Sequence, residues 1–249
     1  MRLLRSILPL LLFASANAEQ VVVAVASNFI APFDELAQAF RQSTGHDVLR
    51  SAGSTGMLYA SISNGAGYAA LLAADAERPQ RLEQEGLSVA GTRFTYAIGG
   101  LELWSFDQHL DAADCREALE TLDDEHLAIA NPEVAPYGVA AKSFLESSGL
   151  WDRVEDNLVF GQNIAQTLQF VVTGNASFGL ISAAQASSGG LPEPSCRWPV
   201  PGSMHPAIEQ QAVLLTSGAQ NDVAKAYLEF LRSEQGKEII RAYGYRVPD

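Results

Sequence analysis

The sequence has few cysteines, few basic residues and no long hydrophobic run. Its two cysteines, Cys115 and Cys196, form no C-x-x-C pair, which argues against a redox dithiol and against a zinc site built on thiolates. The four histidines show neither H-x-x-x-H nor H-E-x-x-H spacing, so the common side-chain patterns for zinc are missing as well. We therefore expect no metal ligands and no resident cofactor.

Basic side chains are scarce. Lys and Arg number 16 against 29 Asp and Glu, which gives a formal net charge of −13 at pH 7. Such an acidic surface repels nucleic acid and anionic membranes, and it gives no long-range attraction to a small anion. Any affinity for an anion has to come from local geometry. With 47% hydrophobic and 18% charged residues, the chain is expected to be compact rather than disordered.

The most hydrophobic segment lies at the N-terminus and is too short for a membrane span, which needs about 20 residues. Arg2 and Arg5 precede the apolar residues 7–13, and Ala16-Asn17-Ala18 is typical of a signal-peptide cleavage site. Residues 1–18 are thus predicted to be a signal peptide, and no cysteine near the cleavage point would carry a lipid anchor. We expect an exported protein in a bacterial periplasm, where Cys115 and Cys196 would form a disulfide.

Strand-like and helix-like segments alternate along the rest of the chain, which predicts a largely parallel α/β architecture. Strands are expected at 21–26, 47–52, 68–72, 92–106, 126–130, 158–160, 178–181 and 208–216. Helices are expected between them, among others at 112–122, 139–145, 165–172, 222–232 and 234–243. The Ser-, Gly- and Pro-rich residues 186–206 are expected to be irregular.

The pattern suggests two α/β lobes joined by two crossings. Gly99-Gly100 interrupts a strand pattern, which often marks a bend where the chain changes domain, and a return is expected near residues 204–208. Lobe 1 would contain residues 19–98 and 207–249, and lobe 2 would contain residues 99–206. Ligands of open α/β sheets lie beyond the carboxyl ends of the strands, so the expected site is a cleft between the lobes.

Four strand-to-helix junctions carry small or polar residues and no Lys or Arg. They are Ser27-Asn28, Ser54-Thr55-Gly56, Pro136-Tyr137-Gly138 and Asn163-Ile164. A helix N-terminus presents unpaired N–H groups and the positive end of the helix dipole, so it can hold an anion without a cationic side chain. Several such ends at one cleft would suit a small, fully ionised oxyanion. The alternative is that Ser27 and Ser54 are ordinary helix caps, because serine is a preferred N-cap residue.

An ordered set of short motifs resembles the periplasmic molybdate-binding proteins of ABC transporters. The set covers nearly the whole chain after residue 18 and consists of VASNF (25–29), SAGSTG (51–56), NPEVAPYG (131–138), SGLW (148–151), GQNIAQ (161–166), SEQGK (233–237) and YGY (243–245). The resemblance implies an α/β, two-lobed type II periplasmic binding protein fold that closes on a tetrahedral oxyanion. It also implies a monomer that captures molybdate, and tungstate with it, for a membrane permease and that is not an enzyme.

The resemblance assigns five ligand-binding residues. Ser27 matches the family's first-helix serine, whose hydroxyl and N–H contact the ligand, and Asn28 supplies the next N–H. Ser54 matches the serine of the second helix. Tyr137 and Ile164 occupy positions from which other members offer backbone N–H groups. The resemblance therefore implies that the oxyanion is held through its oxygens alone, without direct metal ligands.

Two positions depart from the family's pattern. Ser182 stands where many members carry a tyrosine that reaches the oxyanion, and residues 67–70 are Gly-Tyr-Ala-Ala where Pro-Ala-Asp-Val is usual. Tyr137 stands where many members have alanine, so its hydroxyl could donate to the ligand in place of the missing tyrosine. In the alternative interpretation, Tyr137 contributes only its backbone N–H and its ring packs against the lobe.

Three other functions fit the sequence less well. The nearest is a binder of sulfate or another tetrahedral oxyanion with the same fold, because it would use the same neutral donors. A ferric-iron binder would need tyrosine pairs with histidine or carboxylate, and adjacent tyrosines are missing at the matching segment. A serine hydrolase is remote because Ser54 lacks the glycine two positions before it that a nucleophile elbow requires.

Overall fold

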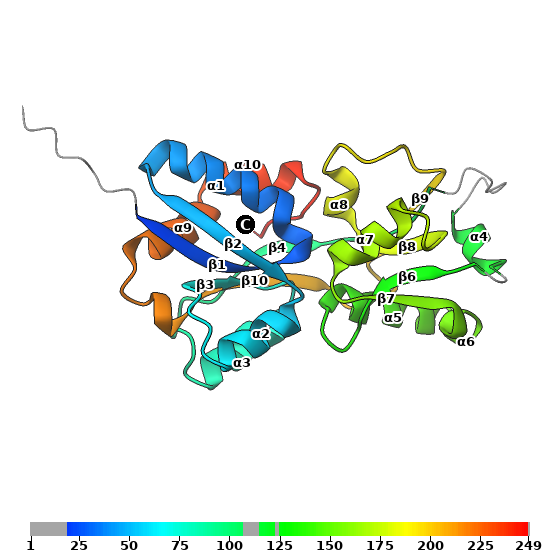
Figure 1. Ribbon diagram of the computed structural model, residues 1–249, viewed down its shortest axis with the longest axis horizontal. Helices are drawn as coiled ribbons and strands as arrows, with labels where there is room; N and C mark the ends of the chain where they lie inside the picture. Colours follow the sequence, from blue (N-terminus) through cyan, green and yellow to red (C-terminus); the bar gives the residue numbers. More distant parts are fainter. Residues whose placement is uncertain (1–18, 107–114, 123–124, 249) are drawn as a thin grey trace, which may run out of the picture.

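The computed structural model describes residues 19–106, 115–122 and 125–248, and within them the chain forms two α/β lobes side by side (Figure 1). The sheet of lobe 1 has the strand order β2-β1-β3-β10-β4. These strands are β1 (Gln20–Ala26), β2 (Asp47–Gly53), β3 (Ala70–Leu72), β4 (Phe94–Gly99) and β10 (Ile208–Leu214). β1 pairs in parallel with β2 and β3, whereas β10 is antiparallel to β3 and β4.

The sheet of lobe 2 repeats this design with the order β7-β6-β8-β5-β9. Its strands are β5 (Leu101–Ser105), β6 (Leu127–Ala130), β7 (Leu158–Gly161), β8 (Phe178–Ser182) and β9 (Cys196–Pro199). β6 runs parallel to β7 and β8, and β5 is antiparallel to β8 and β9. The predicted α/β class and two-lobed fold are therefore confirmed.

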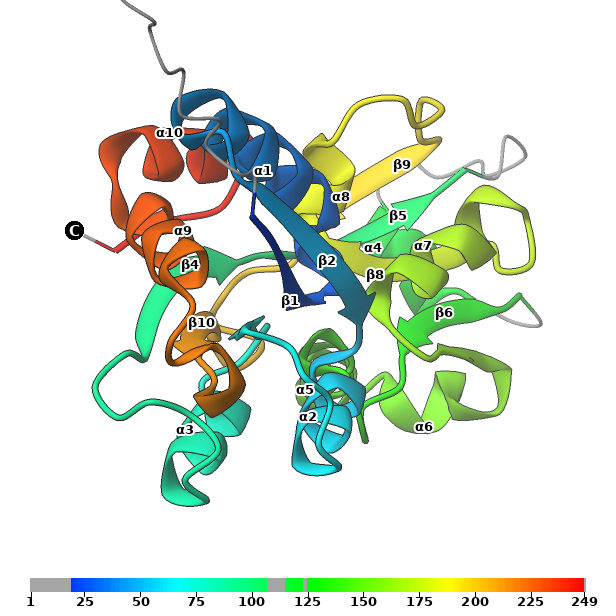
Figure 2. The same cartoon turned by 60° about the vertical axis from the view of Figure 1, so that its left-hand side comes forward.

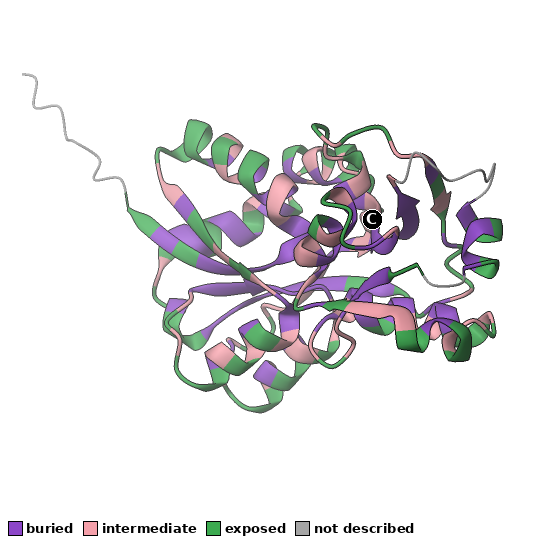
Figure 3. Cartoon of the chain, turned by 45° about the vertical axis from the view of Figure 1, so that its right-hand side comes forward, coloured by how far each residue is buried: buried purple, intermediate pink, exposed green. Residues whose placement is uncertain are grey.

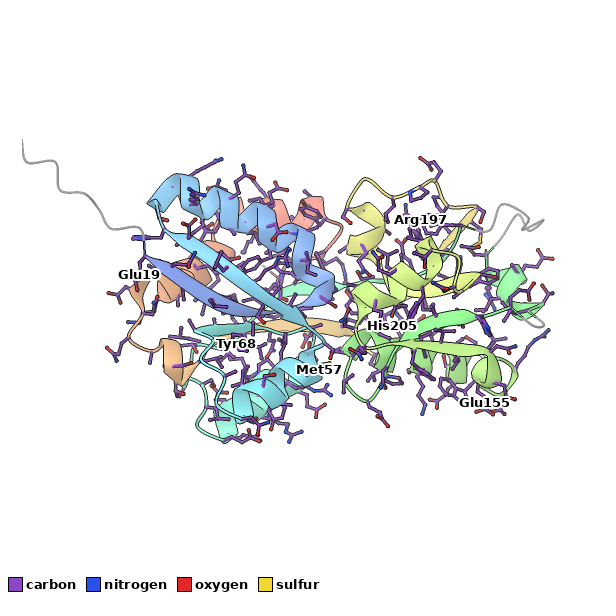
Figure 4. The ribbon with its side chains drawn as sticks, viewed as in Figure 1. Glu19, Met57, Tyr68, Glu155, Arg197 and His205 are labelled. Atoms are coloured by element: carbon purple, nitrogen blue, oxygen red, sulfur yellow. A yellow bond between two sulfur atoms is a disulfide. The ribbon has the colours of Figure 1, made fainter. Side chains whose placement is uncertain are left out.

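Strand β9 was not expected, because residues 186–206 have the composition of a loop. The strand is short, lies at the sheet edge and shows no apolar alternation, so its position depends on tertiary partners. Arg197 donates from Nε and Nη2 to the buried carboxylate of Glu102 on β5, at 2.9 and 3.0 Å. Figure 4 shows the Arg197 side chain on this edge of lobe 2. A strand defined by such contacts leaves little trace in local sequence.

The helices of lobe 1 cover both faces of its sheet (Figure 2). On one face lie α1 (Ile30–Thr44), α9 (Asp222–Arg232) and α10 (Glu234–Ala242), and on the other α2 (Thr55–Ser63) and α3 (Glu77–Gln84). The alternation of β1 fits this arrangement, because Val23 and Val25 pack with the α1 and α9 side chains while Ala24 packs with those of α2. The helix α1 ends at Gly45, whose φ of 78° is the left-handed conformation that glycine adopts readily.

Lobe 2 is a second sandwich of helices around a sheet. Its helices are α4 (Cys115–Glu120), α5 (Pro136–Ser147), α6 (Trp151–Val154), α7 (Ile164–Val172) and α8 (Ala183–Ser187). Short 3₁₀ turns complete the chain at η1 (Ser27–Phe29), η2 (Glu155–Asn157) and η3 (Thr216–Gly218). In both lobes the buried residues concentrate on the strands and on the helix faces turned towards them (Figure 3). None of the helices in the described parts of the chain is long and apolar enough to cross a membrane.

A disulfide joins Cys115 at the start of α4 to Cys196 on β9, as the sequence predicts. The two residues are 81 positions apart, and their Cα atoms are 5.3 Å apart. The disulfide therefore links the edge strand β9 covalently to α4. Of the helix expected at 112–122, residues 115–120 form α4, and residues 112–114 lie outside the described part of the chain.

The chain passes between the two sheets twice. β4 ends at Gly99 and β5 begins at Leu101, so the first passage occurs at the glycine pair. The second passage lies between β9 and β10, and His205, labelled in Figure 4, is on it at the boundary of the lobes. A backbone hydrogen bond of 2.8 Å also joins the lobes directly, from Gly56 N of lobe 1 to Val134 O of lobe 2. The lobes are thus in contact across the cleft.

Candidate functional site

All five residues assigned by the resemblance line one small cavity between the lobes. Ser27, Asn28 and Ser54 belong to lobe 1, whereas Tyr137 and Ile164 belong to lobe 2. The remaining wall is made by small or apolar residues, namely Ala26, Gly53, Thr55, Ala74, Ala135 and Pro136. The cavity is small, with a volume of about 10 Å³. Pockets for drug-sized molecules measure about 300–1,000 Å³, so this cavity suits only a small ion.

The first wall of the cavity is the turn that follows β1. Ser27 and Asn28 lie in the 3₁₀ turn η1, which follows β1 directly and continues into α1 at Ile30, so the strand leads straight into a helical segment as the sequence predicts. Both residues are buried, at 6% and 3% exposure. The N-cap position of this turn is Ala26, and that of α1 is Phe29. Ser27 is therefore not an ordinary N-cap of the following helix.

Ser54 carries the most informative atom of the site. It occupies the N-cap position of α2 with extended backbone (φ −72°, ψ 148°), but its side chain makes no capping bond. Its hydroxyl oxygen is fully buried and has no hydrogen-bond partner among the described residues. Leaving a buried polar group unpaired costs about 1–3 kcal/mol, so such groups usually serve a ligand or a strained function. The capping interpretation of Ser54 is not supported by this geometry.

Two helix N-termini of lobe 2 form the opposite wall. Pro136 is the first residue of α5, and because proline has no N–H, the N–H of Tyr137 is the first that this helix offers. At α7, the side chain of the N-cap Asn163 accepts from Ala165 N and Gln166 N, at 3.0 and 3.1 Å. These bonds satisfy the second and third N–H groups of the helix. The first N–H, that of Ile164, is left to face the cavity.

The electrostatics of the cavity come from dipoles rather than from charged side chains. None of its lining residues is Lys, Arg, His, Asp or Glu. The positive ends of α2, α5 and α7 meet here, and each can stabilise a nearby negative charge. The lining consists of neutral donors with no carboxylate acceptor.

The side chains of Asn28 and Tyr137 point to partners of their own. The amide nitrogen of Asn28 donates to Gln210 Oε1 and Tyr245 Oη, both at 2.8 Å, so only its backbone N–H remains for a ligand. The hydroxyl of Tyr137 accepts from Gln210 Nε2 at 3.4 Å. Burial raises the pKa of Tyr137 well above its ordinary value, so its hydroxyl stays protonated. These contacts favour the interpretation in which Tyr137 offers the ligand its backbone N–H.

Sequence reasoning missed Gln210 and Tyr245. Gln210 is completely buried in β10, where its direct neighbours in sequence are Glu209 and Gln211. A glutamine in a fully buried strand position is a usable signal, because buried polar side chains nearly always have partners. Tyr245 comes from the C-terminal segment after α10 and reaches Asn28 across 217 positions of sequence. No local pattern could predict that contact.

Ser182 does not line the cavity. Its hydroxyl forms a capping box with Gln185 at the start of α8, and Gln185 Nε2 donates to the carbonyl of Ile164 at 3.0 Å. Ser182 and Gln185 therefore hold the first turn of α7 in place and are not part of the cavity wall.

The family model of bacterial extracellular solute-binding proteins matches residues 21–246 of the chain. The chain belongs to this family. Among its relatives is the molybdate-binding protein of Azotobacter vinelandii, which is 44% identical over 236 residues, or 94% of this chain and 93% of the relative. The molybdate-binding protein of Rhodobacter capsulatus is 42% identical over 92% of this chain and 89% of its own length.

Solved structures of the family agree with this assignment. The periplasmic molybdate-binding protein of Azotobacter vinelandii superposes with a TM-score of 0.86 at 34% identity, covering 92% of this chain and all of that structure. The sulfate-binding protein of Mycobacterium tuberculosis superposes with a TM-score of 0.72 at 12% identity, which shows a shared fold alone. The fold is therefore shared by proteins with different ligands, so the ligand of this chain has to be inferred from the residues of its site.

Proposed function

We propose that this solute-binding protein captures molybdate, and tungstate with it, in the cavity between its lobes and delivers the ion to the permease of an ABC transporter. The observation that carries the proposal is the cavity of neutral donors with the unpartnered hydroxyl of Ser54 inside it. The two molybdate-binding relatives, at 44% and 42% identity, support the choice of ion. Ser27, Asn28, Ser54, Tyr137 and Ile164 are the proposed ligand-binding residues.

The chemistry of the donors suits a tetrahedral dianion. Molybdate at neutral pH carries two negative charges and no proton, so it needs hydrogen-bond donors and no acceptor. Phosphate at the same pH carries a proton that would have to face an acceptor, and no carboxylate lines the cavity. Each hydrogen bond to a charged group contributes about 1.5–3 kcal/mol. A set of about five can exceed the ~8 kcal/mol of a micromolar complex after the costs of desolvation and closure.

Other surface hollows of the described chain suit an oxyanion less well. One groove, of about 760 Å³ between α1 and α10, is lined by Asp34, Glu35 and Glu238 among others. A second groove of about 550 Å³ in lobe 2 lies beside Trp151 and Phe160. Negative side chains would repel an oxyanion in the first. In the second, Lys142 is paired with Glu146 at 3.7 Å, and the carboxylate of Glu133 belongs to the lining. The cavity between the lobes, which has donors and no carboxylate, is the better site despite its small volume.

The proposal includes a binding role without catalysis. The homologues are substrate-binding transport proteins. Ser54 has neither histidine nor carboxylate beside it in the cavity wall, so a base that would activate its hydroxyl is lacking there. We propose further that the protein is monomeric and that residues 1–18 direct it to the periplasm.

Titration calorimetry with four anions tests the function. Molybdate and tungstate should bind with one site per chain and sub-micromolar dissociation constants, whereas sulfate should bind at least about 100-fold more weakly and phosphate not measurably. The matched comparison is sulfate, which has the same charge and geometry but is smaller. Equal affinity for sulfate and molybdate would move the assignment to sulfate. Binding of none of the four would refute the oxyanion function altogether.

A further inference from the structure

A buried network of hydrogen bonds lies directly behind the proposed anion site. Gln210 is at its centre and is completely buried. Its Oε1 accepts from Asn28 Nδ2 at 2.8 Å and from Tyr96 Oη at 3.1 Å, and its Nε2 donates to Tyr137 Oη at 3.4 Å. Tyr245 joins the network through Asn28, accepting from its amide nitrogen and donating to its carbonyl. The four tyrosine and asparagine side chains are each less than 5% exposed.

The members of this network are divided unequally between the lobes. Asn28, Tyr96, Gln210 and Tyr245 all belong to elements of lobe 1 or to its C-terminal segment. Tyr137 alone comes from lobe 2, where it lies in the first turn of α5. The bond between Tyr137 and Gln210 therefore crosses the cleft. When the lobes separate, this bond must break, while the bonds among the lobe 1 members can persist.

Gly99 shows that the chain makes room for this contact. A Cβ at this position would collide with the hydroxyl of Tyr137 and would lie 2.9 Å from Gln210 Nε2. The φ of Gly99 is not in the positive range, so glycine is needed here for space rather than for backbone conformation. Gly99 is also the last residue of β4, immediately before the chain passes into lobe 2. The Tyr137 hydroxyl thus inserts at the first crossing between the lobes.

The hydroxyl of Tyr137 lies among residues that are not part of the cavity wall. It accepts from Gln210 Nε2 at 3.4 Å, and it occupies the space that a Cβ at Gly99 would need. Neither Gln210 nor Gly99 lines the anion cavity. The hydroxyl of Tyr137 is therefore directed to the network, whereas its backbone N–H is the first that α5 offers.

We propose that the hydroxyl of Tyr137 is a latch between the lobes, a positioning group that stabilises the closed state and does not touch the bound oxyanion. The inference rests on the proposed function for the identity of the ligand only. Because the backbone N–H of the same residue lines the cavity, closure places this donor at the ligand and the hydroxyl at Gln210 in a single movement. The latch stabilises the closed conformation whichever ion is bound. It therefore increases the affinity by the same factor for every ion that closes the cleft.

The test compares Tyr137→Phe with Tyr96→Phe by stopped-flow release of molybdate and of tungstate. Tyr96 is the matched control, since it is also a buried tyrosine hydroxyl on Gln210 but bonds only within lobe 1. Tyr137→Phe should accelerate release of both ions by the same factor, about three- to tenfold, which is the range for one neutral hydrogen bond. Tyr96→Phe should release them at the parent rate. Unchanged release from Tyr137→Phe, or a factor that differs between the two ions as for a direct contact, would overturn the proposal.

A second variant keeps Tyr137 but fills the space that its hydroxyl occupies. Gly99→Ala should displace the hydroxyl and accelerate release as Tyr137→Phe does, and in the double variant the two effects should not add, because both remove the same bond. Additive effects would show that Gly99 acts elsewhere and would overturn this part of the assignment.

A measurement without ligand separates the latch from the proposed function. Spin labels at the exposed positions Gln42 on α1 and Asp152 on α6 report the distance between the lobes. The ligand-free parent should show a closed component that Tyr137→Phe loses and Tyr96→Phe retains. An identical distance distribution in the parent and in Tyr137→Phe would refute the latch. Failure of the parent to bind molybdate would refute the proposed function and leave this measurement valid.

Discussion

Replacing Ser54 by alanine should weaken anion binding and leave the unliganded protein at least as stable as before. The hydroxyl of Ser54 is buried, has no partner among the described residues and makes no capping bond at α2. In the unliganded protein it therefore costs desolvation without a compensating bond. Its removal should change the free energy of unfolding by about 0 to +1 kcal/mol in favour of the folded state.

The same substitution should remove one hydrogen bond to a charged ligand. The expected loss is about 1.5–3 kcal/mol, which corresponds to about ten- to hundredfold in the dissociation constant. Titration calorimetry with molybdate measures the affinity, and urea denaturation without ligand measures the stability. Together these two measurements should place Ser54→Ala among variants that lose binding without losing stability.

Ser233→Ala is the matched control for this prediction. Ser233 is also a serine at a helix start, but its hydroxyl accepts from Gly236 N at 3.1 Å and so caps α10 far from the cavity. Its replacement should lower the stability by about 1 kcal/mol, the usual value of a cap, and leave the affinity unchanged. If Ser54→Ala behaved like Ser233→Ala, with reduced stability and normal binding, the reasoning about the unpartnered hydroxyl would be refuted.

Three further outcomes are expected. Affinity should fall less than about threefold between 50 and 200 mM salt, because the cavity is lined by neutral donors; a steep fall in calorimetry would point to charged ligand residues. The folded protein should lose stability as the pH rises above about 10, because burial raises the pKa of Tyr137 and Tyr245, so that tyrosines of the unfolded chain release protons that the folded ones keep. Tyr137→Phe should make the decrease of the unfolding free energy with pH, measured by urea denaturation, less steep. An unchanged decrease would contradict this. Reduction of the disulfide between Cys115 and Cys196 should lower the stability by up to about 4.5 kcal/mol in the chain-entropy model, since the bond closes a loop across 81 positions. A reduced protein with the parent's urea midpoint would refute this expectation.

The parts of the site that the sequence predicts are those that depend on local pattern. Ser54, Tyr137 and Ile164 could be placed because each lies at the start of a helix that follows a predicted strand, and a helix start carries unpaired N–H groups whatever surrounds it. The family motifs then gave their order along the chain. The two-lobed fold could be predicted from the same alternation of strands and helices.

The parts that the sequence does not predict depend on partners distant in the chain. The strand β9 is defined by the disulfide at Cys196 and by the contact of Arg197 with Glu102, 95 positions away. The network behind the cavity joins Asn28 to Gln210 and Tyr245 across 182 and 217 positions. Such contacts arise only when the lobes are assembled, so periodicity within a window of a few residues cannot reveal them.

The strand order of lobe 1 has a consequence for how the chain acquires its structure as it emerges, N-terminus first, into the compartment where it folds. β10 lies between β3 and β4, yet it is made after the whole of lobe 2, whose five strands are contiguous between Leu101 and Pro199. The edges of β3 and β4 thus stay unpaired until the last quarter of the chain emerges, and unpaired edges are sites of aggregation. Vectorial folding should therefore complete the inserted lobe first, and the insertion of β10 should be the late step that ends the chain's exposure to misassembly.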